Sequence, residues 1–142
     1  MKPATVSGRL PARMTAFARG ALAAEISWTY VEARWALRDD NLPRAVERLR
    51  DRRLRPGSPL DVADAVRLGR AAGRVLTPLP FDAKCLVRSL VVSSLLARRA
   101  TPTSLVIGVR PGDEFSAHAW VELDGCPILP DGEAGYQRLA VL

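Results

Sequence analysis

The sequence is poor in the side chains that build metal and redox sites: it has one histidine, His118, and two cysteines, Cys85 and Cys126. The cysteines lie far apart and only one imidazole is available, so we expect neither a zinc site nor a disulfide framework. Aromatic residues make up only 6% of the chain. Without a zinc-finger ligand set, an RNA-binding aromatic signature or a helix-turn-helix pattern, we expect no nucleic-acid partner and no cofactor.

Long apolar runs are also missing. No stretch approaches the roughly 18–20 apolar residues that a membrane span needs, and no charged-then-apolar leader precedes the first predicted helix. We therefore expect no membrane partner and a cytoplasmic location in which both thiols are reduced.

The net charge of +6 is unevenly distributed. Residues 1–75 contain fifteen basic and eight acidic side chains, whereas residues 76–142 contain six and seven. Nineteen of the basic residues are arginine, a bias that a GC-rich genome also produces, so charge alone is weak evidence for nucleic-acid binding. A basic N-terminal half would suit an acidic peptide or protein partner.

Helical patterns occupy the first part of the chain. With 142 residues and 48% apolar content, we expect a single domain, 1–142, with a helical N-terminal region at 1–77. Helices are predicted at about 11–37, from a cap at Asn41 to about 54, from a cap at Ser58 to about 76, and at 82–100 with Asp82 as the N-cap. The aromatic residues of the first helix, Trp28, Tyr30 and Trp35, are expected to pack within the protein.

Strand patterns follow these helices. They cover residues 103–110, 115–123, 126–129 and 136–141. Helices followed by antiparallel strands predict an α+β fold, in which the helix at 82–100 packs on a small sheet.

A two-residue hairpin loop at Asp124-Gly125 sets the register of its two strands. It places Leu123 opposite Cys126, Val121 opposite Ile128, and His118 opposite Asp131. Directly opposed residues have Cβ atoms about 4.5–5.5 Å apart, which allows a hydrogen bond between imidazole and carboxylate. The sequence therefore predicts a His118–Asp131 pair, the arrangement that orients the base in a nucleophile–His–acid triad.

Two prolines put this register under strain. Pro127 falls at a non-hydrogen-bonded position and is tolerable, but Pro130 would remove a ladder bond next to Asp131. Glu122 and Asp124 are the alternative acids. Glu122 lies on the His118 face, but four residues along the strand and about 13 Å away.

Cys85 is the candidate nucleophile because it falls in the first turn of the helix predicted at 82–100. Unpaired N–H groups and the positive end of the helix dipole favour a thiolate there, as does the preceding Lys84. Cys126 falls on the hairpin face opposite His118 and is expected to be a small core residue. A free cysteine or a lone histidine is usually a packing residue, so the catalytic interpretation depends on the hairpin register.

These motifs, in this order and spacing, resemble a known family. Cys-Leu-Val-Arg-Ser-Leu at 85–90, Gly-Val-Arg at 108–110, Ala-His-Ala-Trp-Val-Glu at 117–122 and the downstream Asp131 resemble the transglutaminase-like superfamily. Within it, they resemble the leader peptidase of lasso peptide biosynthesis, the protease half of the split B protein. The resemblance covers residues 80–142 and implies a papain- or transglutaminase-like catalytic core at 78–142.

The resemblance implies a cysteine protease that removes the leader from a ribosomally made precursor. Cys85, His118 and Asp131 would correspond to the family's triad, with Arg88 and Trp120 as candidate peptide-binding residues that a structural role would explain as well. The helical N-terminal region differs from the strand-rich recognition domain of fused members. The implied partners are therefore the precursor peptide, a separate leader-recognition protein and the macrolactam cyclase.

Two other functions stay open at this point. The same triad with an amine in place of water would make a transglutaminase-like acyltransferase, because the first half-reaction is identical. A catalytically silent scaffold could bind the precursor or the cyclase through the helical half.

Overall fold

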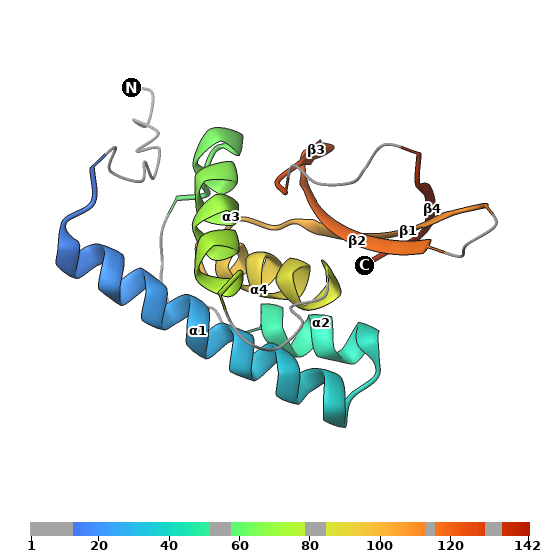
Figure 1. The fold of residues 1–142 in the computed structure, drawn as a ribbon, viewed down its shortest axis with the longest axis horizontal. Helices are drawn as coiled ribbons and strands as arrows, with labels where there is room; N and C mark the ends of the chain where they lie inside the picture. Colours follow the sequence, from blue (N-terminus) through green and yellow to red (C-terminus); the bar gives the residue numbers. More distant parts are fainter. Residues whose placement is uncertain (1–12, 52–57, 79–84, 113–115, 130–134) are drawn as a thin grey trace, which may run out of the picture.

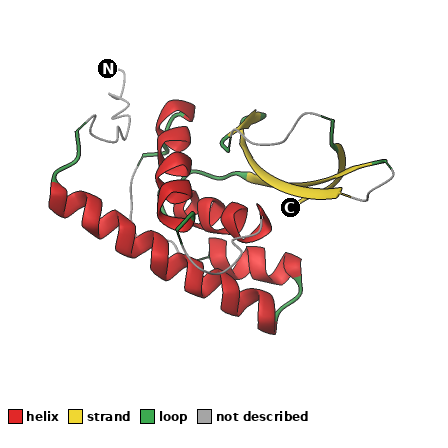
Figure 2. Cartoon of the chain, viewed as in Figure 1, coloured by secondary structure: helices red, strands yellow, loops and turns green. Residues whose placement is uncertain are grey.

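The computed structural model describes residues 13–51, 58–78, 85–112, 116–129 and 135–142 (Figure 1). These residues form four helices followed by four strands, which confirms the predicted α+β fold (Figure 2). The helices are α1 (Ala16–Asp39), α2 (Leu42–Arg50), α3 (Val62–Leu76) and α4 (Cys85–Ala97). The strands are β1 (Ser104–Arg110), β2 (Ser116–Leu123), β3 (Cys126–Pro127) and β4 (Gln137–Val141).

Local capping decides where the helices begin. The Asn41 side chain accepts a hydrogen bond from the Arg44 amide at 3.2 Å, which confirms the predicted start of α2. The prediction that Ser58 caps the third helix was wrong. The Asp61 carboxylate accepts the Asp64 amide at 2.8 Å instead and places the start of α3 at Val62.

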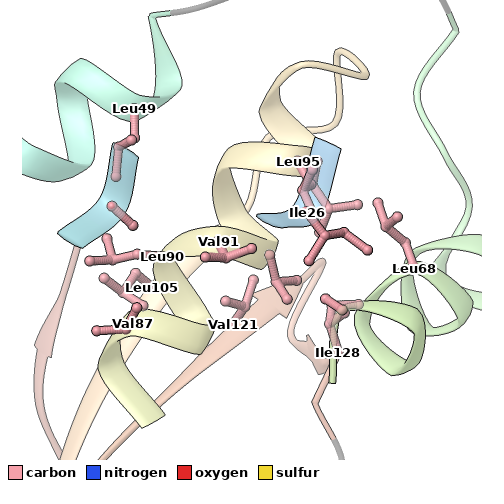
Figure 3. Close-up of a cluster of buried hydrophobic side chains, with 14 of the residues drawn as sticks. Ile26, Leu49, Leu68, Val87, Leu90, Val91, Leu95, Leu105, Val121 and Ile128 are labelled. Carbon is pink, nitrogen blue, oxygen red and sulfur yellow. The ribbon is translucent and has the colours of Figure 1, made fainter. Parts of the chain in front are cut away.

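Helix α4 lies at the centre of the hydrophobic core. It contacts all three other helices and the two central strands, and its apolar side chains face in every direction, as expected of a helix covered all round. Figure 3 shows Val87, Leu90, Val91 and Leu95 of α4 surrounded by side chains from these neighbours. Burial of each such side chain contributes about 1.5–3 kcal/mol, so this core fixes α4 relative to the sheet.

Arg50, the last residue of α2, joins distant parts of the fold. Its guanidinium donates to the backbone carbonyls of Thr103 at 2.9 Å and Leu142 at 3.0 Å, and to the hydroxyl of Ser93 at 3.3 Å. Burial lowers the pKa of Arg50 below its ordinary value. One side chain thus links α2, α4, the entry to β1 and the end of β4.

The sheet is antiparallel, with strand order β3-β2-β1-β4. Its β2–β3 hairpin turns at Asp124 and Gly125, whose φ angles of 51° and 76° are those of a tight two-residue loop. The predicted register is confirmed where the two strands pair, since Leu123 lies opposite Cys126 and the Ile128 amide donates to the Val121 carbonyl at 2.8 Å.

The strand predicted at 126–129 is shorter than expected. Strand β3 ends at Pro127 and the chain bends at Ile128 and Leu129, although the Ile128 amide still donates to Val121. Pro130 and Asp131 lie outside the described residues, as do Asp82 and the predicted end of the second helix near residue 54.

Two burial predictions were wrong. Cys126 is exposed rather than part of the core, because the short edge strand β3 reaches beyond the core. Trp28 and Trp35 are exposed on α1, whereas Tyr30 is buried as expected. Helical spacing turns Tyr30 toward the core and the two tryptophans away from it.

Candidate active site

Cys85 is the first residue of α4 and is partly buried. The predicted N-cap, Asp82, lies outside the described residues, so the place of Cys85 in the first helical turn stays a prediction. Neither Cys85 nor Cys126 forms a disulfide. A first-turn position would put the thiol where a helix start stabilises negative charge.

A buried hydrogen bond holds the first half of α4 against β2. The Ser89 hydroxyl donates to the Ala119 carbonyl at 3.0 Å. This carbonyl points to the same edge of β2 as that of Val121, which accepts from Ile128. Ser89 thus bonds to the β3 side of β2, beyond the residues of β2 that pair with β3.

This contact joins the part of α4 that follows Cys85 to the strand that carries His118. Ser89 lies one helical turn after Cys85, at the spacing that puts Cβ atoms about 5–6 Å apart. Ala119 directly follows His118 in β2, so the His118 side chain lies on the face of the strand that is turned away from the core around α4. Within the described residues, no hydrogen bond joins the Cys85 thiol directly to the His118 imidazole. Catalytic contacts of this kind are often loose before substrate binds.

The His118 ring packs against two aromatic rings. Its centroid is 6.0 Å from that of Trp120, in a stacked arrangement, and 5.3 Å from that of Tyr136, in a tilted one. The Tyr136 hydroxyl lies 3.0 Å from the Ser116 hydroxyl, and the Arg110 guanidinium lies over the Tyr136 ring at 4.5 Å. The imidazole is therefore constrained by packing against both rings.

Gly108 makes this packing possible. It lies opposite His118 in the β1–β2 ladder, and a Cβ atom on it would stand 2.8 Å from two carbons of the Trp120 ring and 3.0 Å from Tyr136 Cβ. Any side chain here would displace the ring that supports His118. The sequence analysis missed Gly108 and Tyr136 as parts of the site, because the pairing of β1 with β4 carries no local signal.

The alternative acids are placed differently. Glu122 is buried, and its Oε1 accepts the Trp120 indole N–H at 2.9 Å and an Arg138 N–H at 2.7 Å. It is thus bonded to the residue that separates it from His118 along this face. Asp124 is exposed in the hairpin turn. The predicted acid, Asp131, lies outside the described residues, so the His118–Asp131 pair stays a prediction.

The two candidate peptide-binding residues also differ. Trp120 is 1% exposed and packs behind the imidazole. Arg88 lies three residues after Cys85 in α4, and its Nε is buried without a hydrogen-bond partner in the part of the chain that the structure describes. Arg88 is therefore a cation one helical turn from the thiol, with an unused donor.

A groove between α1 and α3 is lined by arginine side chains. It encloses about 750 Å³ above an apolar floor that includes Leu22, Ile26 and Leu68, and five arginines line it: Arg13, Arg19, Arg67, Arg70 and Arg74. Helix α3 also packs closely on the chain leading toward Asp131, since a Cβ on Gly69 would lie 3.1 Å from the Ile128 side chain.

The described residues were also compared with what a metal site and a membrane span require. The described residues contain no group of three or more His, Cys, Asp or Glu side chains placed to hold a metal ion. None of the helices in the described ranges has the length and apolar character needed to cross a membrane.

Comparison with known proteins identifies the family. Residues 27–142 match the family model of the transglutaminase-like superfamily, which often contains cysteine proteases and acyltransferases. No curated protein and no solved structure matches the chain. The match is wider than residues 80–142, on which the motif resemblance rests, and reaches back into α1. Since the matched segment takes in most of the sequence, the chain belongs to the transglutaminase-like superfamily.

Proposed function

We propose that this protein is a cysteine peptidase that removes the leader segment from a lasso peptide precursor, with Cys85, His118 and Asp131 as its triad. One observation carries the enzymatic part: the Ser89–Ala119 hydrogen bond joins the part of α4 that follows Cys85 to β2, the strand that carries His118. Membership of the transglutaminase-like superfamily supports cysteine-based acyl transfer. The choice of a lasso precursor rests on the resemblance of the motifs at 85–90 and 117–122.

The proposed reaction has two halves. The Cys85 sulfur bonds to the scissile carbonyl carbon while His118 takes the thiol proton, and His118 then gives that proton to the leaving amine as the C–N bond breaks. Water, deprotonated by His118, next attacks the thioester and releases the thiol. Asp131 would orient the imidazole and stabilise its protonated form.

The start of α4 supplies the expected oxyanion site. Backbone N–H groups there, including that of Cys85, point out of the helix without partners in it. Removal of such a donor typically slows turnover by about 10²–10³-fold. Trp120 and Tyr136 would act as positioning residues, because both rings pack against the imidazole.

Peptide binding would use cations near the thiol and along the helical half. The partly exposed Arg88 side chain, one helical turn from the thiol, suits a carbonyl or carboxylate of the bound peptide. The arginine-lined groove between α1 and α3 suits an acidic segment of the precursor. A separate recognition protein would deliver the leader, and the cyclase would close the macrolactam after cleavage.

The test is mass spectrometry of the precursor encoded by the neighbouring genes, incubated with this protein and the recognition protein. We expect wild type and Cys126→Ala to release a leader fragment with one water added, and Cys85→Ala to leave the precursor intact. Cys126 is the matched control because it is the other free thiol and is exposed. Cleavage by Cys85→Ala would overturn the assignment.

Two other outcomes would select the competing functions. Loss of ammonia from the precursor, with an amine joined to it, would indicate an acyltransferase. An unchanged precursor that still binds would indicate a scaffold. Alkylation by iodoacetamide at pH 7 separates the scaffold further: an activated Cys85 should react faster than Cys126, although Cys126 is the more exposed thiol.

A further inference from the structure

Helix α1 carries a second apolar face, turned away from the core. Its buried face includes Ile26, Tyr30, Ala33 and Ala36. The other face bears six exposed apolar residues, which we call the exposed seam: Phe17, Ala21, Ala24, Trp28, Val31 and Trp35. In Figure 1, α1 runs along the outer edge of the helical layer, so no other described helix or strand covers one side of it.

The spacing of the exposed seam is that of a helix-pairing surface. Successive members are separated alternately by four and three residues, the pattern that keeps one stripe facing a partner helix. From Phe17 to Trp35 the stripe is about 27 Å long at 1.5 Å per residue. Two hollows border it, and the larger, of about 430 Å³, lies toward α2 between Trp28, Trp35 and Leu49.

The exposure of these side chains is large for a monomer. Phe17 is 87% exposed, Trp28 62% and Trp35 65%. Since an aromatic side chain carries about 150–250 Å² of surface, these three rings leave roughly 300–500 Å² open in each copy. Two copies would supply roughly 600–1,000 Å² from the rings alone, close to the ~1,000 Å² that a stable interface needs.

The order of residue sizes along the exposed seam fits a second copy running in the opposite direction. The antiparallel register that sets Ala24 opposite Trp28 of the other copy also sets Ala21 opposite Val31 and Phe17 opposite Trp35. Each inner pair, Ala24 with Trp28 and Ala21 with Val31, thus sets a small residue against a larger one and occurs twice in the dimer. An aromatic pair of Phe17 and Trp35 lies at each end. A surface that pairs with itself in this way is what a two-fold dimer requires.

The carboxylates beside the exposed seam do not oppose this pairing. The acidic residues that border the exposed seam, Glu25 and Glu32, are bonded within the chain to Arg99 at 2.8 Å and Arg98 at 2.5 Å. Two copies can therefore approach without bringing unneutralised carboxylates together. We propose that the protein forms a two-fold dimer in which the exposed seams of two α1 helices pack antiparallel, independently of the proposed peptidase activity.

Sedimentation equilibrium of the full chain over a range of concentrations tests the proposal. We expect wild type to form dimers, and both Ala24→Trp and Trp28→Ala to weaken association by about tenfold or more. The combined Ala24→Trp, Trp28→Ala variant exchanges the small and large members of one layer, so it should recover most of the association. Leu139→Glu is the matched control, since Leu139 is a comparably exposed apolar residue on β4.

Circular dichroism at the same concentrations would verify that each variant is folded. A monomeric wild-type protein at all concentrations would overturn the proposal. So would a dimer that the single substitutions leave unchanged, or a combined variant no stronger than the weaker single variant. Cleavage of a precursor is not measured here, so failure of this proposal and failure of the proposed peptidase remain distinguishable.

Discussion

The two faces of β2 have different tasks, although their residues alternate along one strand. Ala119, Val121 and Leu123 are buried, and the latter two belong to the core around α4. On the other face, His118, Trp120 and Glu122 form a chain of ring contacts and hydrogen bonds. One face of the strand thus holds the sheet on α4, while the other carries His118, the base of the proposed triad.

The largest effect on precursor cleavage is expected from replacing His118, on the face of β2 that is turned away from α4. His118→Ala should lower precursor cleavage by about 10³-fold or more, because the base that activates Cys85 would be lost. The thermal midpoint should change little, since His118 is only partly buried. Cleavage rates and thermal melts measured on the same sample check both halves, and a His118→Ala variant with near wild-type turnover would contradict the proposed triad.

A break on the core face should act on stability instead. Leu123→Ala removes a buried side chain and should lower the free energy of unfolding by about 2–3 kcal/mol. Turnover per folded molecule should stay close to wild type, because Leu123 points away from His118. Urea denaturation gives the stability, and a large loss of turnover without destabilisation would show that the two faces are not separable.

Gly108→Ala tests the His118 face of β2 indirectly, because the added methyl group on β1 would press against the Trp120 ring. The new methyl would meet the ring at 2.8 Å, so we expect a loss of about 1–3 kcal/mol in stability and slower alkylation of Cys85. Gly73→Ala is the matched control in α3, where nothing lies within 4 Å of the added Cβ. That variant should gain about 0.5–1 kcal/mol from helix propensity. Equal effects of the two substitutions in denaturant titrations would argue against a special role of Gly108.

The smallest effect is expected at the far end of the same face. Glu122→Gln keeps an acceptor for the Trp120 indole but removes the charge that pairs with Arg138. We expect about 1 kcal/mol of destabilisation and a smaller loss of turnover than in Gly108→Ala. If Glu122→Gln instead abolished cleavage without unfolding the protein, Glu122 would replace Asp131 as the acid in the proposed triad.

Two predictions that depended on local chemistry are confirmed, although the Ser58 cap was wrong. Asn41 caps α2, and the Asp124-Gly125 turn sets the β2–β3 register. Each of these is decided by a few consecutive residues, whose backbone preferences and side-chain hydrogen bonds act over short distances.

Predictions that depended on distant parts of the chain were less successful. Cys126 was expected to be buried from the hairpin register, and Trp28 and Trp35 from their apolar residue type. Each of them lies where no other described element covers it. The site shows the same division. Cys85 and His118 could be selected from the helix start and the single histidine, whereas Ser89, Gly108 and Tyr136 gain their roles only from contacts across the fold.

The sequence by itself determined the order of helices and strands, the hairpin register and the two residues most suited to acyl transfer. It did so because helix starts, tight turns and alternating strands follow from neighbouring residues. Only the tertiary structure decided that Ser89 bonds to the Ala119 carbonyl of β2, that His118 packs against Trp120 and Tyr136, and that α1 keeps an apolar face in solvent. These features depend on which elements pack together, and that is set by burial summed over the whole core rather than by any one segment.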